Sequence, residues 1–393
     1  MAGQNPCAGI GDWDTFRSVM PVCRRYIYFD HAAVAPLPDP TRRAVEAWLH
    51  EATEHGDVNW PQWAEQIEAL RRETAEFLGA LPIEIALVRN TCHGISIVAE
   101  GFPWRPGDNV VIPAHEFPAN QYPWLALKDR GVEVRRVPPK DDGTIDLRAL
   151  EEACDSRTRV LAVSWVDYLT GFRIDPAELA AMAHRKGAYF LLDAIQGLGV
   201  FPLDVQQAEI DFLAADGHKW LLGPEGAGIF YCRDSLWDML RPTSVGWNSV
   251  EHPFDFHRIA PLWKPSAARF EGGSQNMMGF VALRASLSLL RSFGTEALSR
   301  RSLFLTEAIC SVLQRCGASI LSQRDERHAS GIVSFTIPDI DPIRLRQSLL
   351  QRGVVLSLRE SKLRVSPHAY NNEDDIASFD RILQDAIKSC RMD

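Results

Sequence analysis

The chain has 393 residues, 46% hydrophobic and 24% charged, so it can bury a sizeable core as two domains or as one large domain with a smaller companion. Its formal net charge of −9 argues against a nucleic-acid-binding surface, which needs clustered cations. No segment reaches the roughly 20 uninterrupted apolar residues of a membrane span, and the first residues lack the basic start and apolar stretch of a signal peptide.

Helical and strand-like segments alternate between about residues 65 and 235. Residues 64–79 have apolar positions at helical spacing and end at Gly79, a plausible C-cap. Short, non-alternating apolar runs follow, separated in places by helical stretches such as Pro176–Lys186. Such runs are typical of strands buried on both faces, so they predict an α/β fold with a largely parallel sheet between helices. The runs are Ala86–Val88, Val110–Ile112, Val132–Val137, Val160–Val166, Phe190–Leu192, Phe212–Ala214 and Gly228–Tyr231.

The pattern changes in the C-terminal third. Residues 279–316 are mostly helical in pattern, and a last helix is expected near Glu373 with Asn372 as its N-cap. Between them lie two strand candidates and a helical stretch: Gly331–Ile337, Val354–Leu358 and Pro342–Gln351. We therefore expect a large domain over residues 26–264 and a smaller α+β domain over residues 265–393 together with residues 1–25.

Asp193 and Lys219 are the leading candidates for chemistry. Asp193 follows the run Phe190–Leu192 directly, and Lys219 comes shortly after the run Phe212–Ala214. Ligands of open parallel sheets bind beyond the carboxyl ends of the strands, so both side chains are expected in one site. Taken alone, the two residues could also form a buried ion pair without function.

A series of motifs places this pair in a wider context. The motifs are Tyr28-Phe-Asp-His-Ala-Ala33, Arg89-Asn-Thr-Cys-His93, Glu116-Phe-Pro-Ala-Asn120, Asp193 with Gln196, His218-Lys219, Arg269-Phe-Glu-Gly-Gly-Ser-Gln-Asn276 and Arg364-Val-Ser-Pro-His-Ala-Tyr-Asn371. In this order they resemble the class V aminotransferases of the fold type I pyridoxal-phosphate enzymes, and most closely the cysteine desulfurase and selenocysteine lyase-like branch. The resemblance implies a mostly parallel, seven-stranded type of sheet in a large pyridoxal-phosphate-binding domain, with a smaller C-terminal α+β domain.

The resemblance also implies the catalytic roles and the cofactor, pyridoxal 5′-phosphate. Lys219 would hold the cofactor as a Schiff base and then act as the base that moves the substrate's α-proton. Asp193 would face the pyridine nitrogen and keep it protonated, which makes the ring an electron sink. Gln196 would donate a hydrogen bond to the phenolic oxygen, unless it is an ordinary exposed polar residue.

The cofactor phosphate is expected where Thr91 and Cys92 open a helix, because backbone N–H groups at a helix start bind anions. Thr91 could instead only cap that helix. By the resemblance, His218 is a further phosphate contact. Ser274 matches a position that reaches the phosphate from the other subunit, which predicts a homodimer.

The remaining site candidates surround the ring and the substrate. Phe117 falls where many relatives place a histidine over the cofactor ring; it can stack there without transferring protons, or it can be a core residue. Arg364 matches the arginine that clamps the substrate carboxylate, although a surface arginine is the alternative. Trp247 and Ala33 are expected in the substrate pocket, and a purely structural role for Trp247 is equally compatible with the sequence.

The sequence departs from cysteine desulfurases in one respect. Those enzymes carry a nucleophilic cysteine on a loop before the substrate arginine, whereas residues 354–370 contain no cysteine. Persulfide transfer to a protein thiol is therefore not expected, and Cys92 is a poor substitute by position. The eight cysteines are scattered singly, which is typical of reduced thiols and predicts a cytoplasmic protein. No histidine cluster has metal-ligand spacing, so no metal is expected.

Three acidic or phenolic residues have no assigned role. Asp216 stands where many relatives have a hydroxyl residue near the phosphate, and a carboxylate facing the phosphate would be repelled, so it is expected to be turned away or capping. Asp167 and Tyr168 replace an asparagine that some relatives place near the cofactor oxygen.

The function predicted first is a lyase that acts at the α-carbon of a small amino acid, by β-elimination or C–S cleavage, without a persulfide cysteine. An aminotransferase or an amino-acid epimerase of the same family is the alternative. A cofactor-free binding or structural protein is a third hypothesis, against which the intact Asp193, Gln196, His218 and Lys219 argue. The substrate side chain, the leaving group and the pathway are not predicted.

Overall fold

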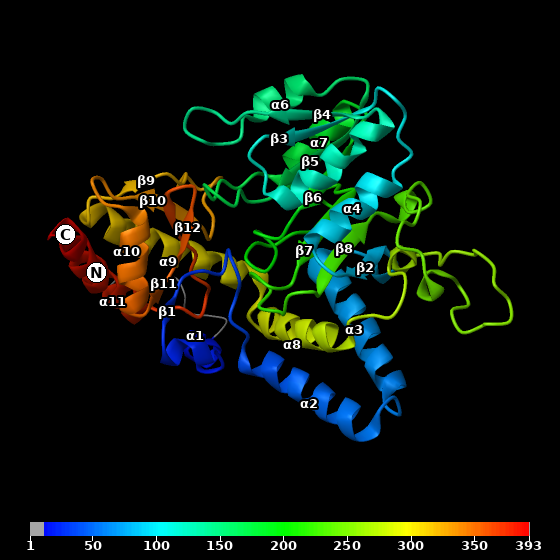
Figure 1. The fold of residues 1–393 in the computed structure, drawn as a ribbon, viewed down its shortest axis with the longest axis horizontal. Coiled ribbons are helices and arrows are strands. Elements are labelled where there is room, and N and C mark those ends of the chain that lie inside the picture. The colour runs from blue at the N-terminus through cyan, green and yellow to red at the C-terminus, as the bar shows by residue number, and fades with distance from the viewer. Residues whose placement is uncertain (1–11, 393) are drawn as a thin grey trace, which may run out of the picture.

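The computed structural model describes residues 12–392 (Figure 1). Residues 1–11 lie outside the described residues. The prediction about a signal peptide falls on them, as does part of the N-terminal segment predicted for the smaller domain. No helix between residues 12 and 392 combines the length and the apolar character that crossing a bilayer requires.

The centre of the molecule is a seven-stranded sheet. Its strands are β2 (Ile85–Val88), β3 (Asn109–Pro113), β4 (Glu133–Val137), β5 (Thr158–Ser164), β6 (Tyr189–Asp193), β7 (Phe212–Asp216) and β8 (Gly228–Cys232). The spatial order is β2-β8-β7-β6-β5-β3-β4, with β8 antiparallel to both neighbours and all other pairs parallel. The predicted strands and the mostly parallel sheet are confirmed.

Helices cover both faces of this sheet. Because alternate side chains of one strand point to opposite faces, each strand contributes to two cores. Leu213 of β7 joins the core beneath α3 (Trp60–Leu78), α7 (Pro176–Arg185) and α8 (Met277–Phe293). Its neighbours Phe212 and Ala214 join the opposite core, beneath α4 (Thr91–Gly101) and α5 (Tyr122–Leu125). The apolar runs therefore do not alternate in sequence because both of their faces are buried. Three further helices precede the C-terminal body: α1 (Trp13–Ser18), α2 (Asp39–His55), which packs on α8, and α6 (Leu147–Ala153).

The C-terminal residues form a second body with its own core, seen in orange and red in Figure 1. Its strands are β9 (Ser319–Ile320), β10 (Val333–Thr336), β12 (Ser357–Arg359) and β13 (Lys362–Val365), in the antiparallel order β12-β13-β10-β9. Its helices are α9 (Thr295–Arg315), α10 (Pro342–Gln351) and α11 (Glu373–Met392). The Asn372 side chain accepts the Asp375 N–H at 3.0 Å, as expected of the N-cap of α11.

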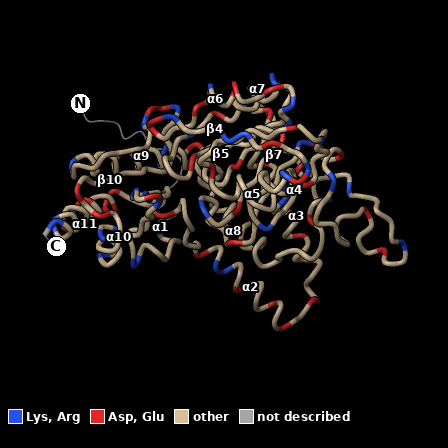
Figure 2. Tube along the Cα trace, turned by 45° about the horizontal axis from the view of Figure 1, so that its top comes forward, with Lys and Arg blue, Asp and Glu red and all other residues tan. Residues whose placement is uncertain are grey.

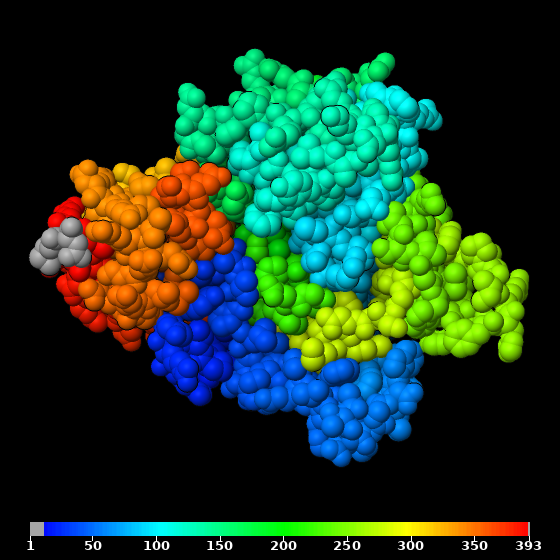
Figure 3. Space-filling model, viewed as in Figure 1, coloured from blue at the N-terminus to red at the C-terminus, as the bar shows by residue number. Residues whose placement is uncertain are grey.

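The N-terminal segment links the two bodies. β1 (Ile27–Tyr28) pairs in parallel with β11 (Val354–Val355), so the motif that begins at Tyr28 lies beside the C-terminal body. The space-filling view shows the blue N-terminal residues against both the orange C-terminal body and the green residues of the sheet domain (Figure 3). The site described below forms where these three parts of the chain meet.

One predicted helical segment is divided. Gly294, with φ of 79°, ends α8 and separates it from α9, so residues 279–316 are two helices. α8 packs on α2 and α3 and contributes Leu283 and Leu287 to the core of the large sheet. Leu305 of α9, in contrast, lies in the core of the C-terminal body. The domain division at residue 265 stays a prediction.

Candidate active site

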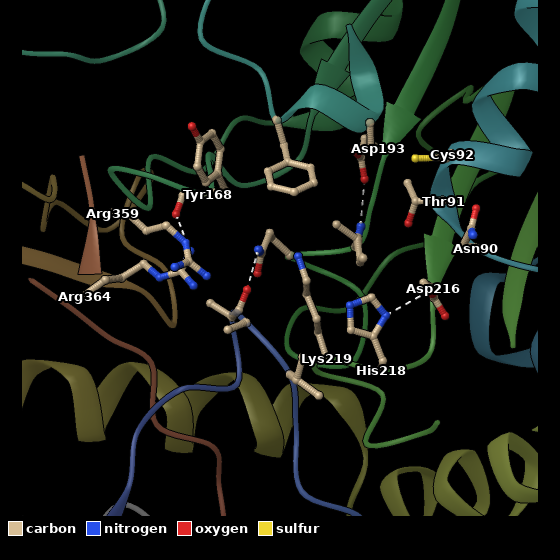
Figure 4. A pocket seen from close by; sticks show the side chains of 17 residues that line it. Asn90, Thr91, Cys92, Tyr168, Asp193, Asp216, His218, Lys219, Arg359 and Arg364 are labelled. Atoms are coloured by element: carbon tan, nitrogen blue, oxygen red, sulfur yellow. Dashed lines mark hydrogen bonds and ion pairs between the residues drawn. The ribbon is translucent and has the colours of Figure 1, made fainter. Parts of the chain in front are cut away.

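A cavity of about 330 Å³ lies at the carboxyl ends of β6 and β7 (Figure 4). Four parts of the chain contribute to it: the N-terminal segment, the start of α4, the ends of the central strands and the hairpin formed by β12 and β13. The residues that line it are Ala32, Ala33, Val34, Asn90, Thr91, Cys92, Phe117, Ala119, Tyr168, Asp193, Ile195, Gln196, Asp216, His218, Lys219, Arg359 and Arg364. Every predicted site residue except Trp247 and Ser274 is therefore brought to one cavity.

Asp193 and Lys219 lie together at the base of the cavity. Asp193 is the last residue of β6, and Lys219 follows β7 in a tight turn where a Cβ on Gly217 would lie 2.7 Å from the Ala227 carbonyl oxygen. Both side chains are buried. Burial raises the pKa of the Asp193 carboxyl, while the Ile195 N–H and the Lys219 charge oppose that rise.

The pKa of the Lys219 amine is shifted in the opposite direction. Burial lowers it, the positive charge of Arg364 lowers it further, and the Asp193 carboxylate opposes both effects. More of the amine is therefore neutral near pH 7 than for an exposed lysine. A neutral amine is the form that attacks a carbonyl carbon.

Gln196 is oriented by two hydrogen bonds. The Trp220 indole N–H, which can only donate, bonds to the Gln196 Oε1 at 2.9 Å. The Gln196 Nε2 must then be the end that faces the Ala32 carbonyl, to which it donates at 3.0 Å. Its second N–H remains for a ligand in the cavity. Gln196 is buried, so it is not the exposed polar residue that was the alternative.

The start of α4 forms an anion cradle. Asn90, not Thr91, is the N-cap: its Oδ1 accepts the His93 N–H at 2.9 Å. The Thr91 hydroxyl is buried without a hydrogen-bond partner among the described residues. A buried hydroxyl without a partner is costly, so its position at the cavity wall indicates a ligand that it bonds.

Asp216, whose role the sequence left open, holds His218. One Asp216 oxygen accepts the Gly217 N–H at 2.7 Å, and the other lies 2.9 Å from the His218 Nδ1. Both oxygens are thereby occupied by protein groups. The His218 Nδ1 makes this close contact without a hydrogen bond, and the other ring nitrogen remains for a ligand.

Phe117 and Tyr168 contribute two aromatic rings to the wall of the cavity. Phe117 is 43% exposed, which excludes the core position that was its alternative, and its ring centroid lies 5.5 Å from the Lys219 Nζ. The Tyr168 ring contacts the Phe117 ring edge-on at 5.3 Å. Asp167, by contrast, caps its own turn, since its Oδ1 accepts N–H groups of Leu169 and Thr170.

Arg364 projects from β13 and is buried, so it is not a surface arginine. Its guanidinium donates to the Tyr168 carbonyl at 2.6 Å and to the Ser357 hydroxyl at 3.3 Å, and Asp30 lies 3.8 Å away. Burial lowers its pKa, while Asp30 opposes this. The group is thus held at the cavity by two hydrogen bonds, and Asp30 is the one carboxylate of residues 12–392 with which it forms an ion pair.

Arg359, which no sequence motif identified, also lines the cavity. Glu360 and Ser361, with φ of 45° and 65°, form a tight turn between β12 and β13. The turn fixes the register, which places Arg359 and Arg364 on one face of the hairpin. In the sequence, Arg359 and Arg364 stand on either side of Glu360-Ser361. This spacing predicts that both side chains share one face only if a two-residue turn at Glu360-Ser361 is already known.

Trp247 and Ser274 lie outside this cavity. Both line a separate hollow of about 260 Å³, together with residues such as Trp60 and Phe254. Within one chain they do not reach Lys219. Any contribution from them to a substrate pocket or to the site of a second subunit stays a prediction.

Cys92 is the one cysteine that lines the cavity among residues 12–392. It is the second residue of α4. The residue is exposed at the cavity, but partial desolvation raises the pKa of its thiol, and the charges of Asp193 and Asp216 raise it further. The thiol is therefore a poor source of thiolate.

Comparisons with known proteins identify the family of the chain. The model of the family "Aminotransferase class-V" matches residues 27–379. A probable cysteine desulfurase of Methanothermobacter thermautotrophicus is 30% identical, covering 94% of this chain and 96% of the relative. A cysteine desulfurase of Escherichia coli superimposes with a TM-score of 0.87 at 25% identity, over 97% of this chain and all of the other.

A further solved structure contains a cystine C–S lyase in complex with its reaction product, cysteine persulfide. Its TM-score is 0.87 at 25% identity, with 93% of this chain and 99% of that chain covered. The chain belongs to the class V aminotransferases, a family of pyridoxal-phosphate-dependent enzymes. The described residues fit such a cofactor, because the buried Thr91 hydroxyl lacks a partner at a helix start while a buried lysine and a buried carboxylate face the same cavity.

Proposed function

We propose that this enzyme is a lyase that cleaves a β-substituted L-amino acid, with a C–S bond as the preferred target. The balanced reaction is β-thio-substituted amino acid plus water to pyruvate, ammonia and a thiol. A small amino-acid-like substrate fits a cavity of about 330 Å³ that carries one buried guanidinium beside the lysine. The alternative is an aminotransferase or an amino-acid epimerase of the same family.

The observation that carries the proposal is the short hairpin before Arg364. Only Glu360 and Ser361 lie between β12 and β13, and neither they nor the strands contain a cysteine. A nucleophilic cysteine on a loop at this point would be needed to accept sulfur from the substrate. Cys92 enters the cavity from the opposite side, with a raised pKa. Sulfur would therefore leave with the product and not as a protein persulfide.

The residues would hold the cofactor at both of its ends. Thr91, the backbone N–H groups at the start of α4 and His218 would bind the phosphate, and Asp193 would pair with the ring nitrogen. Phe117 would stack on the ring. When bound, the cofactor supplies an electron-withdrawing ring that stabilises negative charge at the substrate's α-carbon.

The chain's own groups would then perform the proton transfers. Arg364 would bind the α-carboxylate and orient the α-hydrogen towards Lys219. The Lys219 amine would take this proton and would return a proton to the departing sulfur. Gln196, held by Trp220, would donate its free N–H to the phenolic oxygen and fix the tilt of the ring.

We also infer a homodimer in which Ser274 reaches the partner's phosphate, and a cytoplasmic location. Trp247 and Ser274 lie in one hollow away from Lys219, an arrangement that suits residues directed to a second copy. Charged residues of both signs are interspersed along the chain, which suits a water-exposed surface (Figure 2). Sedimentation of the purified enzyme tests the dimer, and a Ser274→Ala variant with weaker cofactor retention would support the contact across it.

A direct assay separates the candidate reactions. Borohydride treatment should bleach the yellow protein and leave the cofactor on the peptide that contains Lys219. Pyruvate and ammonia should then form from S-substituted cysteines without an added keto acid. Dependence on a keto acid would identify an aminotransferase, and exchange of the α-proton without consumption would identify an epimerase. A colourless protein that binds no cofactor would support the cofactor-free hypothesis.

A further inference from the structure

The cavity contains a guanidinium for which the proposed reaction has no use. Arg364 is assigned to the α-carboxylate, whereas Arg359 lines the same cavity without any role. Arg359 forms no ion pair with any residue between positions 12 and 392, and its one recorded hydrogen bond is to the adjacent Leu358 carbonyl at 2.9 Å. An arginine with free N–H groups at a cavity wall is suited to bind a carboxylate.

The hairpin register places the two arginines as neighbours. Arg364 of β13 pairs with Ser357 of β12, and Arg359 lies two residues after Ser357 in β12. The side chains of Arg359 and Arg364 therefore point to the same face of the hairpin. Such diagonal neighbours in an antiparallel pair are roughly 7 Å apart. The two side chains therefore start from separate positions of the hairpin and both reach the cavity, where each can offer its own N–H groups to a ligand.

Too few carboxylates face this cluster to neutralise it. Asp30 is the nearest, at 3.8 Å from Arg364, and it also accepts a hydrogen bond from Ser357. The charges of Arg364 and Arg359 both lower the pKa of the Asp30 carboxyl, against the effect of burial. Asp167 also raises the pKa of Arg364, but Asp30 is the one carboxylate of residues 12–392 that forms an ion pair with either guanidinium.

The acidic groups of the cavity lie elsewhere. Figure 4 shows Arg359 and Arg364 on one side of Lys219, while Asp216 lies on the other side, beside His218. Asp216 is engaged with His218 and with a backbone N–H. A substrate side chain that extends towards Arg359 therefore meets two guanidinium groups, and no carboxylate of residues 12–392 lies closer than 3.8 Å to either of them.

We infer that Arg359 is a second anion subsite that selects substrates with a carboxylate on the side chain, in addition to the α-carboxylate bound by Arg364. The inference rests on the proposed function and specifies its substrate class: β-thio-substituted amino acids whose leaving thiol carries an acid group. Aliphatic leaving groups offer Arg359 no acceptor, and an amide offers only a neutral carbonyl oxygen, so neither forms the charge-assisted pair that a carboxylate forms.

Two matched ligands test this subsite: S-carboxymethyl-L-cysteine and its neutral amide, S-carbamoylmethyl-L-cysteine. Their dissociation constants for the holoenzyme are measured by the stopped-flow change in cofactor absorbance, and pyruvate is measured separately. We expect the carboxylate to bind about ten- to a hundredfold more tightly than the amide, as for a hydrogen-bonded charged pair. Arg359→Gln should bring this ratio to about one without changing the affinity for the amide.

Lys362→Gln is the matched control. Lys362 pairs with Arg359 on the same face of the hairpin and carries the same charge, but it does not line the cavity. The Lys362→Gln variant should keep most of the preference for the carboxylate ligand over the amide. Arg359→Lys should keep part of this preference, since a lysine retains the charge without the bidentate geometry.

The outcomes are separable. Equal weakening of both ligands by Arg359→Gln, or an unchanged ratio, would overturn the subsite and assign Arg359 to the α-carboxylate or to hairpin structure. A preference for the carboxylate that disappears in Arg359→Gln supports the subsite even if neither ligand yields pyruvate. In that last case the lyase assignment fails while the anion subsite stands.

Discussion

The two halves of the cavity are built differently. The cofactor half consists of Asp193, Lys219 and Thr91, which lie at the ends of buried strands or at the start of a buried helix. The substrate half consists of Arg359 and Arg364 on a short antiparallel hairpin. Strand ends of a parallel sheet fix positions strongly, because the strands are buried on both faces. The hairpin belongs to the C-terminal body, so a substitution in its turn can alter which substrate binds without disturbing the large sheet.

Lys219→Ala should have the largest effect, in the cofactor half. Loss of both the cofactor attachment and the proton-transferring amine should reduce kcat by about 10⁴-fold. The hairpin that carries Arg359 and Arg364 is unchanged in this variant, so its affinity for the substrate should persist. Single-turnover and binding measurements on the cofactor-loaded variant check this, and a variant that retains a tenth of the wild-type rate would remove Lys219 from catalysis.

Asp193→Asn tests the other cofactor contact with an isosteric side chain. Without the carboxylate the ring nitrogen loses its counter-charge, and kcat should fall by about 10²- to 10³-fold with KM little changed. The cofactor absorbance spectrum should change as well. If kcat stayed within a few-fold of wild type, the proposed pairing with Asp193 would be wrong.

Arg364→Gln belongs to the substrate half and should act mainly on KM. Removing one bidentate, charge-assisted contact should raise KM for α-carboxylate substrates by about ten- to a hundredfold, with a smaller effect on kcat. Steady-state kinetics with an amino acid and its α-amide distinguish this from general damage, because the amide should be insensitive to the substitution. Unchanged affinity for both would contradict the clamp.

The pH dependence of cofactor attachment couples the two halves. Attachment requires the neutral Lys219 amine, so its rate should rise with pH through a midpoint below that of an ordinary lysine, because burial and Arg364 lower that pKa. Arg364→Gln removes a charge that lowers the pKa and should move the midpoint up. Asp193→Asn removes a charge that raises the pKa and should move it down. Stopped-flow absorbance across pH 6–10 measures both shifts, and two shifts of the same sign would contradict the charge arrangement.

The cofactor half could be predicted from the sequence because each residue is adjacent to an apolar run or helix start. Asp193 and Thr91 were located by such neighbours, and the strands were correct because buried parallel strands leave short apolar runs. The Asn90 cap in place of Thr91 was not predicted, since both residue types cap helices. The role of Asp216 was also missed, because it depends on the rotamer of His218 two residues away.

The substrate half could be predicted only in part. Arg364 was identified by its motif, whereas Arg359 depends on the register of a hairpin whose turn residues, Glu360 and Ser361, are unusual for left-handed backbone. The position of α8 was also unexpected, since the helical pattern of residues 279–316 does not reveal on which body each half packs. Tertiary packing decides these points, and local sequence does not encode it.

The central claim is cleavage by Lys219 and Asp193 without a protein persulfide, and one measurement addresses it directly. Pyruvate, ammonia and free thiol are quantified from an S-substituted cysteine for the wild type and for Cys92→Ala, with mass spectrometry of the intact protein after turnover. We predict equal amounts of the three products, a rate for the variant within a few-fold of the wild type, and no added sulfur mass. Sulfur retained on the wild-type protein, together with loss of turnover in Cys92→Ala, would contradict the account.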